Sequence, residues 1–205
     1  MMDDRSIVMC GVGGQGPILA SRLIAQAAMK KGIHVRSAET IGMAQRGGSV
    51  FIHLRLGAAA ASPRIGRGKA DLIIGFEPAE AVRMLGYLKK DGYMVVSSKP
   101  IMPVTASLGA SSYPLEEVLQ YLQDHVRNLF VIDGALAEQM LGTARCLNVV
   151  LLGAAARSGA LGLTPEDLSG SIRERLPEKL HALNERALGL EECVTRVTGE
   201  ERELI

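Results

Sequence analysis

Aromatic residues are scarce in this sequence: tryptophan is absent, and phenylalanine and tyrosine together make up 3% of 205 residues. Proteins that bind single-stranded nucleic acid stack bases on aromatic side chains, so this composition argues against such a partner. An excess of charge of one sign is also lacking, because the chain has 23 basic and 22 acidic residues and a formal net charge of +1. We therefore expect neither a nucleic-acid partner nor an anionic membrane surface.

Cysteine is rare as well. Cys10, Cys146 and Cys193 lie far apart, so they offer no C-x-x-C pair and no disulfide framework. The four histidines show no spacing typical of a metal site, and an iron–sulfur cluster needs several cysteine ligands. We expect a reduced, cytoplasmic protein without a metal site on this chain.

Long hydrophobic runs are missing too. The longest apolar run, residues 147–156, falls well short of the ~18 residues of a membrane span. The N-terminus also lacks the layout of a signal peptide. Hydrophobic residues nevertheless make up 47% of the chain, which is enough to bury a sizeable core. We expect one domain, residues 1–205, with no membrane partner.

Short apolar runs alternate with helical periodicity along the chain. Residues 7–10 predict a buried strand, residues 16–31 a helix, and residues 34–38 a second strand. This is a βαβ unit, for which we expect a parallel pair of strands. Residues 50–56 alternate between hydrophobic and polar, as in an edge or antiparallel strand.

Further strands are expected at residues 71–76, 93–97 and 129–132, with helices from residue 78 to about 90 and at 115–126. Thr164-Pro165-Glu166-Asp167 has the features of a helix start. The expected fold class is α/β with three layers. Its mostly parallel sheet starts with the βαβ unit and a Gly-rich turn, includes at least one antiparallel or edge strand, and is followed by a helical C-terminal part from about residue 145.

The sharpest motif is Gly11-Val12-Gly13-Gly14-Gln15-Gly16, between the first strand and the first helix. The G-x-G-x-x-G spacing in this context is typical of a turn that binds phosphate at a helix N-terminus. Glu39 stands where a dinucleotide-binding fold places its ribose-binding acid. The glycines are equally compatible with a tight turn that serves packing alone. The candidate ligand-binding residues are Gly11, Gly13, Gly14, Gln15 and Gly16.

Two other segments could contribute to a site. Gln45, Arg46, Gly47 and Gly48 lie in a glycine-framed loop between two strands, suited to an anion or a partner surface, or simply solvated. Glu77 follows a strand at the edge where open α/β sheets bind ligands, but it could instead complement a helix dipole. No nucleophile elbow, P-loop or H-E-x-x-H motif is present, so we assign no catalytic residue.

Three segments carry a resemblance: GVGGQGPILASRLIAQAA, AETIGMAQRGGSVFIHLRLG and ADLIIGFEPAEAVRML. They resemble the gamma-type domain of the 2-oxoacid:ferredoxin oxidoreductases, and in particular the small (beta) subunit of indolepyruvate:ferredoxin oxidoreductase. The likeness extends over nearly the whole chain. The GGQG turn is shared by gamma domains, whereas residues 42–48 followed by Phe76-Glu77-Pro78 favour the indolepyruvate branch.

The resemblance implies a subunit of an enzyme that oxidatively decarboxylates aryl-2-oxoacids to acyl-CoA and reduces ferredoxin. Thiamine diphosphate, Mg and the [4Fe–4S] clusters are then expected on a separate large subunit, because this chain has neither a thiamine motif nor cluster ligands. The chain would be inactive alone, would reach ferredoxin through a hetero-oligomeric complex, and could contact CoA. Two alternatives stay open: a free-standing nucleotide-binding dehydrogenase that uses Glu39, and a binding module whose glycine turn is only structural.

Overall fold

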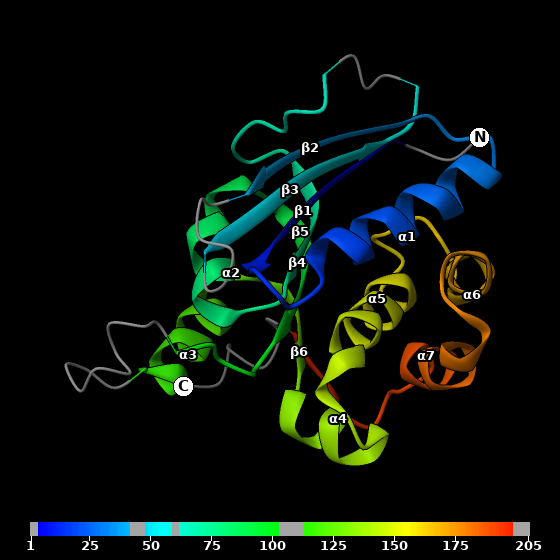
Figure 1. Ribbon diagram of the computed structural model, residues 1–205. Coiled ribbons are helices and arrows are strands. Elements are labelled where there is room, and N and C mark those ends of the chain that lie inside the picture. The colour runs from blue at the N-terminus through cyan, green and yellow to red at the C-terminus, as the bar shows by residue number, and fades with distance from the viewer. Residues whose placement is uncertain (1–3, 42–47, 59–61, 103–112, 199–205) are drawn as a thin grey trace.

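The computed structural model describes residues 4–41, 48–58, 62–102 and 113–198. A seven-stranded sheet in the order β2-β3-β1-β4-β5-β6-β7 forms its centre (Figure 1). The strands are β1 (Arg5–Val12), β2 (Val35–Ile41), β3 (Ser49–Leu56), β4 (Ala70–Gly75), β5 (Leu88–Ser97), β6 (Asn128–Ile132) and β7 (Val194–Thr198). The helices are α1 (Pro17–Lys30), α2 (Pro78–Met84), α3 (Leu115–His125), α4 (Gly134–Leu141), α5 (Leu147–Arg157), α6 (Pro165–Arg175) and α7 (His181–Leu188).

Helices cover both faces of the sheet (Figure 1). On one face, α1, α5, α6 and α7 bury a large core with β-strand residues such as Ile7, Ile52 and Leu72. On the other face, α2 and α3 bury a smaller core around Val8, Ile73 and Met94. Alternate residues of the same strands enter the two cores, as the two-residue period of a strand requires. The expected three-layer α/β architecture is confirmed.

The sheet is mixed but mostly parallel. β1, β4, β5 and β6 pair in parallel, whereas β3 and β7 run antiparallel to their neighbours. Five of the seven strands therefore point the same way, since β2 is also antiparallel to β3. The carboxyl ends of the parallel strands meet at one edge of the sheet, where ligands bind in open α/β folds.

The expected pairing of the first two strands is wrong in one respect. β1 and β2 run in the same direction, but β3 lies between them and pairs with both. An antiparallel neighbour needs only a short connection, which residues 42–48 provide between β2 and β3. Ile52, Leu54 and Leu56 of β3 are fully buried, so this strand belongs inside the sheet rather than at its edge.

Two further elements differ from expectation. The helix expected to reach about residue 90 ends at Met84, because a 3-10 turn (Leu85–Tyr87) leads into β5, whose first residue Leu88 pairs with Ala70. The C-terminal part also contains a strand, β7, that was not expected from the helical pattern. It is held by pairing with the otherwise open edge of β6.

The start of α6 matches expectation. The Thr164 side chain accepts a hydrogen bond from the backbone of Asp167, and the Asp167 carboxylate accepts one from the backbone of Thr164.

Among the helices that the structure describes, no single one is long and apolar enough to cross a membrane. One pair of segments, Gly134–Leu141 and Ala144–Arg157, reaches that length and composition only together and is bent by 119°.

Candidate functional site

The glycine turn lies at the carboxyl edge of the sheet and is built for close packing at two positions. A Cβ on Gly11 would stand 2.7 Å from the Cβ of Phe76, at the end of β4. Gly16 caps α1 with φ +86°, and a Cβ there would stand 2.6 Å from Nδ2 of Asn148. Only glycine adopts the second conformation without strain. These two glycines bring β4 and α5 against the turn.

Gln15 holds the turn in place from inside. Its Oε1 accepts a hydrogen bond from the backbone N–H of Val12 at 2.7 Å. Its Nε2 donates to the carbonyl of Phe76 at 2.8 Å. Both ends of the side-chain amide are therefore used within the protein. Gln15, a candidate ligand residue from the sequence, fixes the backbone of the turn against the carboxyl end of β4.

Part of the turn remains available to a ligand. The N–H groups of Gly13 and Gln15 donate to the carbonyls of Gly48 and Val12. Those of Gly14 and Gly16 make no backbone hydrogen bond to any residue that the structure describes. Pro17 begins α1, so the N–H groups of the next helical residues complete the donors at this helix end.

A cavity of about 240 Å³ opens beside these donors. The N-terminal ends of two helices meet there, α1 at the turn and α5 at Leu147 and Asn148. Both helix dipoles place partial positive charge at the cavity. The residues that line it include Gly14, Gln15, Phe76, Lys99, Arg145 and Asn148. Such a lining favours an anion.

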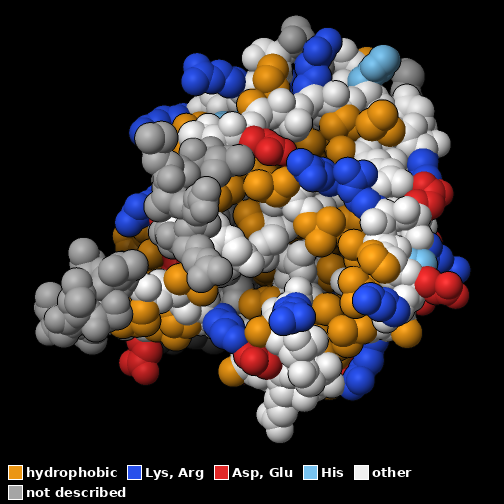
Figure 2. All heavy atoms as spheres, in the orientation of Figure 1, with side chains coloured by type: hydrophobic (Ala, Val, Ile, Leu, Met, Phe, Trp, Pro, Cys, Tyr) orange, Lys and Arg blue, Asp and Glu red, His pale blue; other side chains and the backbone are white. Residues whose placement is uncertain are grey.

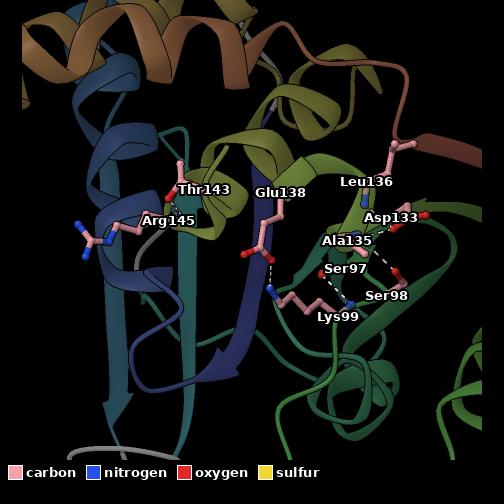
Figure 3. Close-up of polar contacts among 10 residues, drawn as sticks. Ser97, Ser98, Lys99, Asp133, Ala135, Leu136, Glu138, Thr143 and Arg145 are labelled. Atoms are coloured by element: carbon pink, nitrogen blue, oxygen red, sulfur yellow. Dashed lines mark hydrogen bonds and ion pairs between the residues drawn. The ribbon is translucent and has the colours of Figure 1, made fainter. Parts of the chain in front are cut away.

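Two cations stand at this cavity. Lys99 forms an ion pair with Glu138 of α4, so part of its charge is already balanced (Figure 3). Arg145 lies on the 3-10 turn before α5 and points away from Glu138 (Figure 3). Its guanidinium has no hydrogen bond or ion pair with any described residue and is exposed. On the face seen in Figure 2, lysine and arginine side chains stand among hydrophobic ones. Arg145 is therefore the freer of the two cations.

Asn148 adds a buried polar group. The residue is 5% exposed, and its Oδ1 accepts a hydrogen bond from the N–H of Val149 at 3.0 Å. Its Nδ2 faces Gly16 and has no hydrogen-bond acceptor among the described residues. Nδ2 is not among the fully buried atoms that lack a partner, so it is accessible at the cavity that Asn148 lines and can donate to a ligand acceptor there.

Glu77 caps α2 instead of facing the cavity. Its carboxylate accepts a hydrogen bond from the N–H of Glu80 at 2.9 Å and one from the hydroxyl of Tyr113 at 2.6 Å. Burial, together with the hydrogen bond to Glu77, raises the pKa of Tyr113, which therefore stays a donor at neutral pH. With 2% exposure, Glu77 is buried as a helix cap.

The remaining candidates divide into those described and those not. Gln45, Arg46 and Gly47 lie outside the described residues. Gly48 lies beside the glycine turn, since its carbonyl accepts from the N–H of Gly13 at 2.9 Å. Glu39 is exposed on β2 and is separated from β1 by β3. A dinucleotide-binding fold needs the acid on the strand next to the turn, so this topology argues against that alternative.

Lys99, Arg145 and Asn148 were not singled out from the sequence. Lys99 follows the carboxyl end of β5, the same position that made Glu77 a candidate after β4. Arg145 and Asn148 have no such signal, because they reach the site only through the packing of α5 against the turn. The three cysteines are buried, and no group of three or more metal-ligating side chains occurs in the described ranges.

A larger cavity, of about 730 Å³, lies at the opposite edge of the sheet. Its acidic side chains are already paired, Asp71 with Lys89 and Asp91 with Arg127. The C-terminal end of α5 also lines it, through Ser158 and Gly159. Carbonyl groups at a helix C-terminus repel anions, so the cavity beside the glycine turn is the better anion site.

Comparison with known proteins gives a consistent result. The family model described as pyruvate ferredoxin/flavodoxin oxidoreductase matches residues 6–190. The chain is 38% identical to the indolepyruvate oxidoreductase subunit IorB of Pyrococcus horikoshii, over 92% of this chain and 95% of that protein. It is 37% identical to the subunit of the same name from Archaeoglobus fulgidus, over 89% and 91% of the two chains.

Solved structures show the same fold. The pyruvate oxidoreductase subunit PORC of Thermotoga maritima superposes with a TM-score of 0.69 at 20% identity, over 94% of this chain and 98% of that one. The 2-oxoglutarate:ferredoxin oxidoreductase of Magnetococcus marinus, solved with 2-oxoglutarate, coenzyme A and succinyl-CoA bound, gives a TM-score of 0.60 at 20% identity. That match covers 92% of this chain and 30% of the other.

Proposed function

Because this chain belongs to the pyruvate ferredoxin/flavodoxin oxidoreductase family, we propose that it is the small subunit of an indolepyruvate-type 2-oxoacid:ferredoxin oxidoreductase. The near full-length similarity to the IorB subunits is the observation that carries this proposal. The reaction of such a complex is oxidative decarboxylation of an aryl-2-oxoacid to an acyl-CoA, with electrons passed to ferredoxin.

In this proposal the redox cofactors belong to a large partner subunit in a cytoplasmic hetero-oligomer. Thiamine diphosphate with Mg would supply the decarboxylation chemistry and [4Fe–4S] clusters would carry the electrons to ferredoxin. This chain would contribute binding and positioning groups. In the sequence, Gln45, Arg46, Gly47 and Gly48 lie between β2 and β3, and Gly48 contacts Gly13 of the glycine turn. In this proposal the segment faces the partner.

We further propose that the cavity beside the glycine turn takes an anionic part of CoA. The fit rests on donors that line the cavity: the N–H group of Gly14, the amide of Asn148 and the guanidinium of Arg145. The N–H group of Gly16 lies two residues further along the same turn. Phosphates bind well at helix N-termini and to a planar arginine fork. The side-chain amide of Gln15 would hold this surface in shape through its hydrogen bond to the carbonyl of Phe76.

The direct test is reconstitution with the large subunit of the proposed complex. The purified chain alone should be colourless, free of stoichiometric iron and inactive with indolepyruvate, CoA and ferredoxin. The complex should be brown and active. Iron on the isolated chain, or turnover without a partner, would contradict the subunit assignment.

The CoA contact is tested separately in that complex. Arg145→Gln should raise the KM for CoA by about tenfold, the loss expected for a charge-assisted hydrogen bond, and leave kcat nearly unchanged. Arg22→Gln, an exposed arginine on α1, is the matched control and should leave both constants unchanged. Equal KM values for the two variants would place CoA elsewhere.

A further inference from the structure

A second cavity, of about 370 Å³, lies on the other face of the sheet, where β2 and β3 are covered by the segment around Arg64. It is lined by Thr40, Phe51, His53, Arg64, Arg67 and Tyr87. Phe51 and Tyr87 pack against the smaller core formed with α2 and α3. The glycine turn and the proposed CoA cavity involve none of these residues.

Three rings form one wall of this cavity. Phe51 and His53 meet edge to face, with centroids 5.7 Å apart and ring planes at 78°. His53 and Tyr87 meet in the same manner at 5.3 Å and 77°. In a chain with only 3% aromatic residues, this grouping is notable. Edge-to-face rings leave faces and edges on which another flat ring can pack.

His53 carries an unused donor at this wall. The residue is 6% exposed, and its Nδ1 accepts a hydrogen bond from the N–H of Ile65 at 3.3 Å. The ring proton of the neutral form therefore lies on Nε2. Nε2 has no partner among the described residues and is not fully enclosed, so it opens into the cavity that the ring lines.

The rim of the cavity is cationic. Arg64 and Arg67 are both exposed, and neither guanidinium has a hydrogen bond or ion pair with a residue that the structure describes. No acidic side chain belongs to the described lining. Burial and the charge of Arg64 lower the pKa of His53, so its ring is neutral near pH 7 and donates through Nε2. Two guanidinium groups at one rim match the double charge of a phosphate monoester.

We propose that this cavity binds a phosphate carried on a flat aromatic ring system, of the size of a nucleoside monophosphate. The ring packs against Phe51 and Tyr87, the phosphate is held by Arg64 and Arg67, and Nε2 of His53 donates to an acceptor of the ligand. The volume lies within the range of small-ligand pockets, roughly 300–1,000 Å³. This site goes beyond the proposed function and does not depend on it.

Calorimetric titration of the full chain with AMP, GMP, inorganic phosphate and indole-3-acetate tests the proposal. At least one nucleotide should bind, and inorganic phosphate and the aryl carboxylate should each bind about tenfold more weakly or not at all. Tighter binding of indole-3-acetate, or equal binding of inorganic phosphate, would overturn the assignment. So would the absence of binding by both nucleotides at millimolar concentration.

Variants locate the site. Arg64→Gln and Arg67→Gln should each weaken nucleotide binding by about tenfold, while Arg22→Gln should leave it unchanged. His53→Gln removes the Nε2 donor, and Tyr87→Leu removes a ring from the wall of the cavity. Melting curves of both variants show whether each remains folded. In the wild-type protein, the nucleotide that binds must also shift the NMR signals of the His53 ring nitrogens. Binding that survives both arginine variants, or an unshifted His53 signal, would contradict the proposal.

Discussion

The side-chain amide of Gln15 donates a hydrogen bond to the carbonyl oxygen of Phe76, 2.8 Å away. The two residues are 61 positions apart in the sequence, and they join the glycine turn after β1 to the carboxyl end of β4. The N–H of Phe76 in turn donates to the carbonyl of Cys10 at 2.7 Å. The turn is thus fixed by hydrogen bonds to its neighbour strand before any ligand arrives.

Removal of this amide should destabilise the protein. Gln15→Ala leaves the N–H of Val12 and the carbonyl of Phe76 without their partners and should cost about 1–3 kcal/mol in the free energy of unfolding. Urea denaturation measures the loss. Gln120→Ala, at an exposed position on α3, should stay within about 0.5 kcal/mol of the unchanged chain. Equal losses in the two variants would show that Gln15 does not hold the turn.

Gly16 should tolerate alanine less well than Gly142. Both have positive φ, +86° and +74°, so alanine at either position costs about 1–2 kcal/mol in backbone strain. Only at Gly16 does the added Cβ also meet Asn148, since nothing lies within 4 Å at Gly142. Urea unfolding of Gly16→Ala and Gly142→Ala should therefore show the larger loss for Gly16. The reverse order would mean that α5 is not packed against the turn.

Arg46 should matter for assembly and not for the fold. A guanidinium framed by glycines suits a carboxylate, phosphate or partner acid. Arg46→Ala should shift the unfolding free energy by less than about 0.5 kcal/mol. It should weaken capture by the large subunit or lower turnover, and Arg46→Lys should restore little because the fork is lost. Unchanged assembly and turnover would make it an ordinary solvated residue, and a collapsed melting curve would make it a structural anchor.

His53 should make stability depend on pH. Its pKa is lowered by burial and by Arg64, so below the ordinary value of ~6.5 the unfolded chain binds more protons than the folded one. Stability is then lost as the pH falls through ~6.5 toward the lower folded value. Urea unfolding at about pH 7.5 and about pH 5.5 measures the decrease. His53→Gln should reduce the difference between the two pH values, whereas His34→Gln, at an exposed position, should retain it.

The sequence identifies local features of the fold well. The periodicity of residues 16–31, the capping residues from Thr164 and the glycine turn all act over a few neighbouring residues, and each lies where it was expected. The position of β3 between β1 and β2 was missed, because strand order depends on which strands pair over long stretches of sequence and not on the spacing within a strand. β7 was missed for a similar reason, since its five residues are held by the edge of β6.

In the site, too, features set by neighbouring residues were predicted and features set by long-range packing were missed. Gly11 and Gly16 were identified by their spacing, and the structure gives a steric reason for each. Arg145 and Asn148 were missed, because only the packing of α5 brings them to a turn more than 120 residues away. Glu77 was selected by its place after β4, yet its carboxylate is used by α2 and by Tyr113, a residue 36 positions away.

The insertion of β3 also bears on the order in which the site can form during folding. β2 and β3 are close in the sequence and can pair as a hairpin, a step that takes about 1–10 μs in isolated hairpins. β1 must close longer loops to reach β3 and β4, at a greater cost in chain entropy. The contact of Gly13 with Gly48 requires β1 to be docked already. The shape of the glycine turn therefore depends on two long-range pairings of β1, with β3 through Gly48 and with β4 through Phe76, and a mispaired β1 would displace the N–H groups of the turn directly.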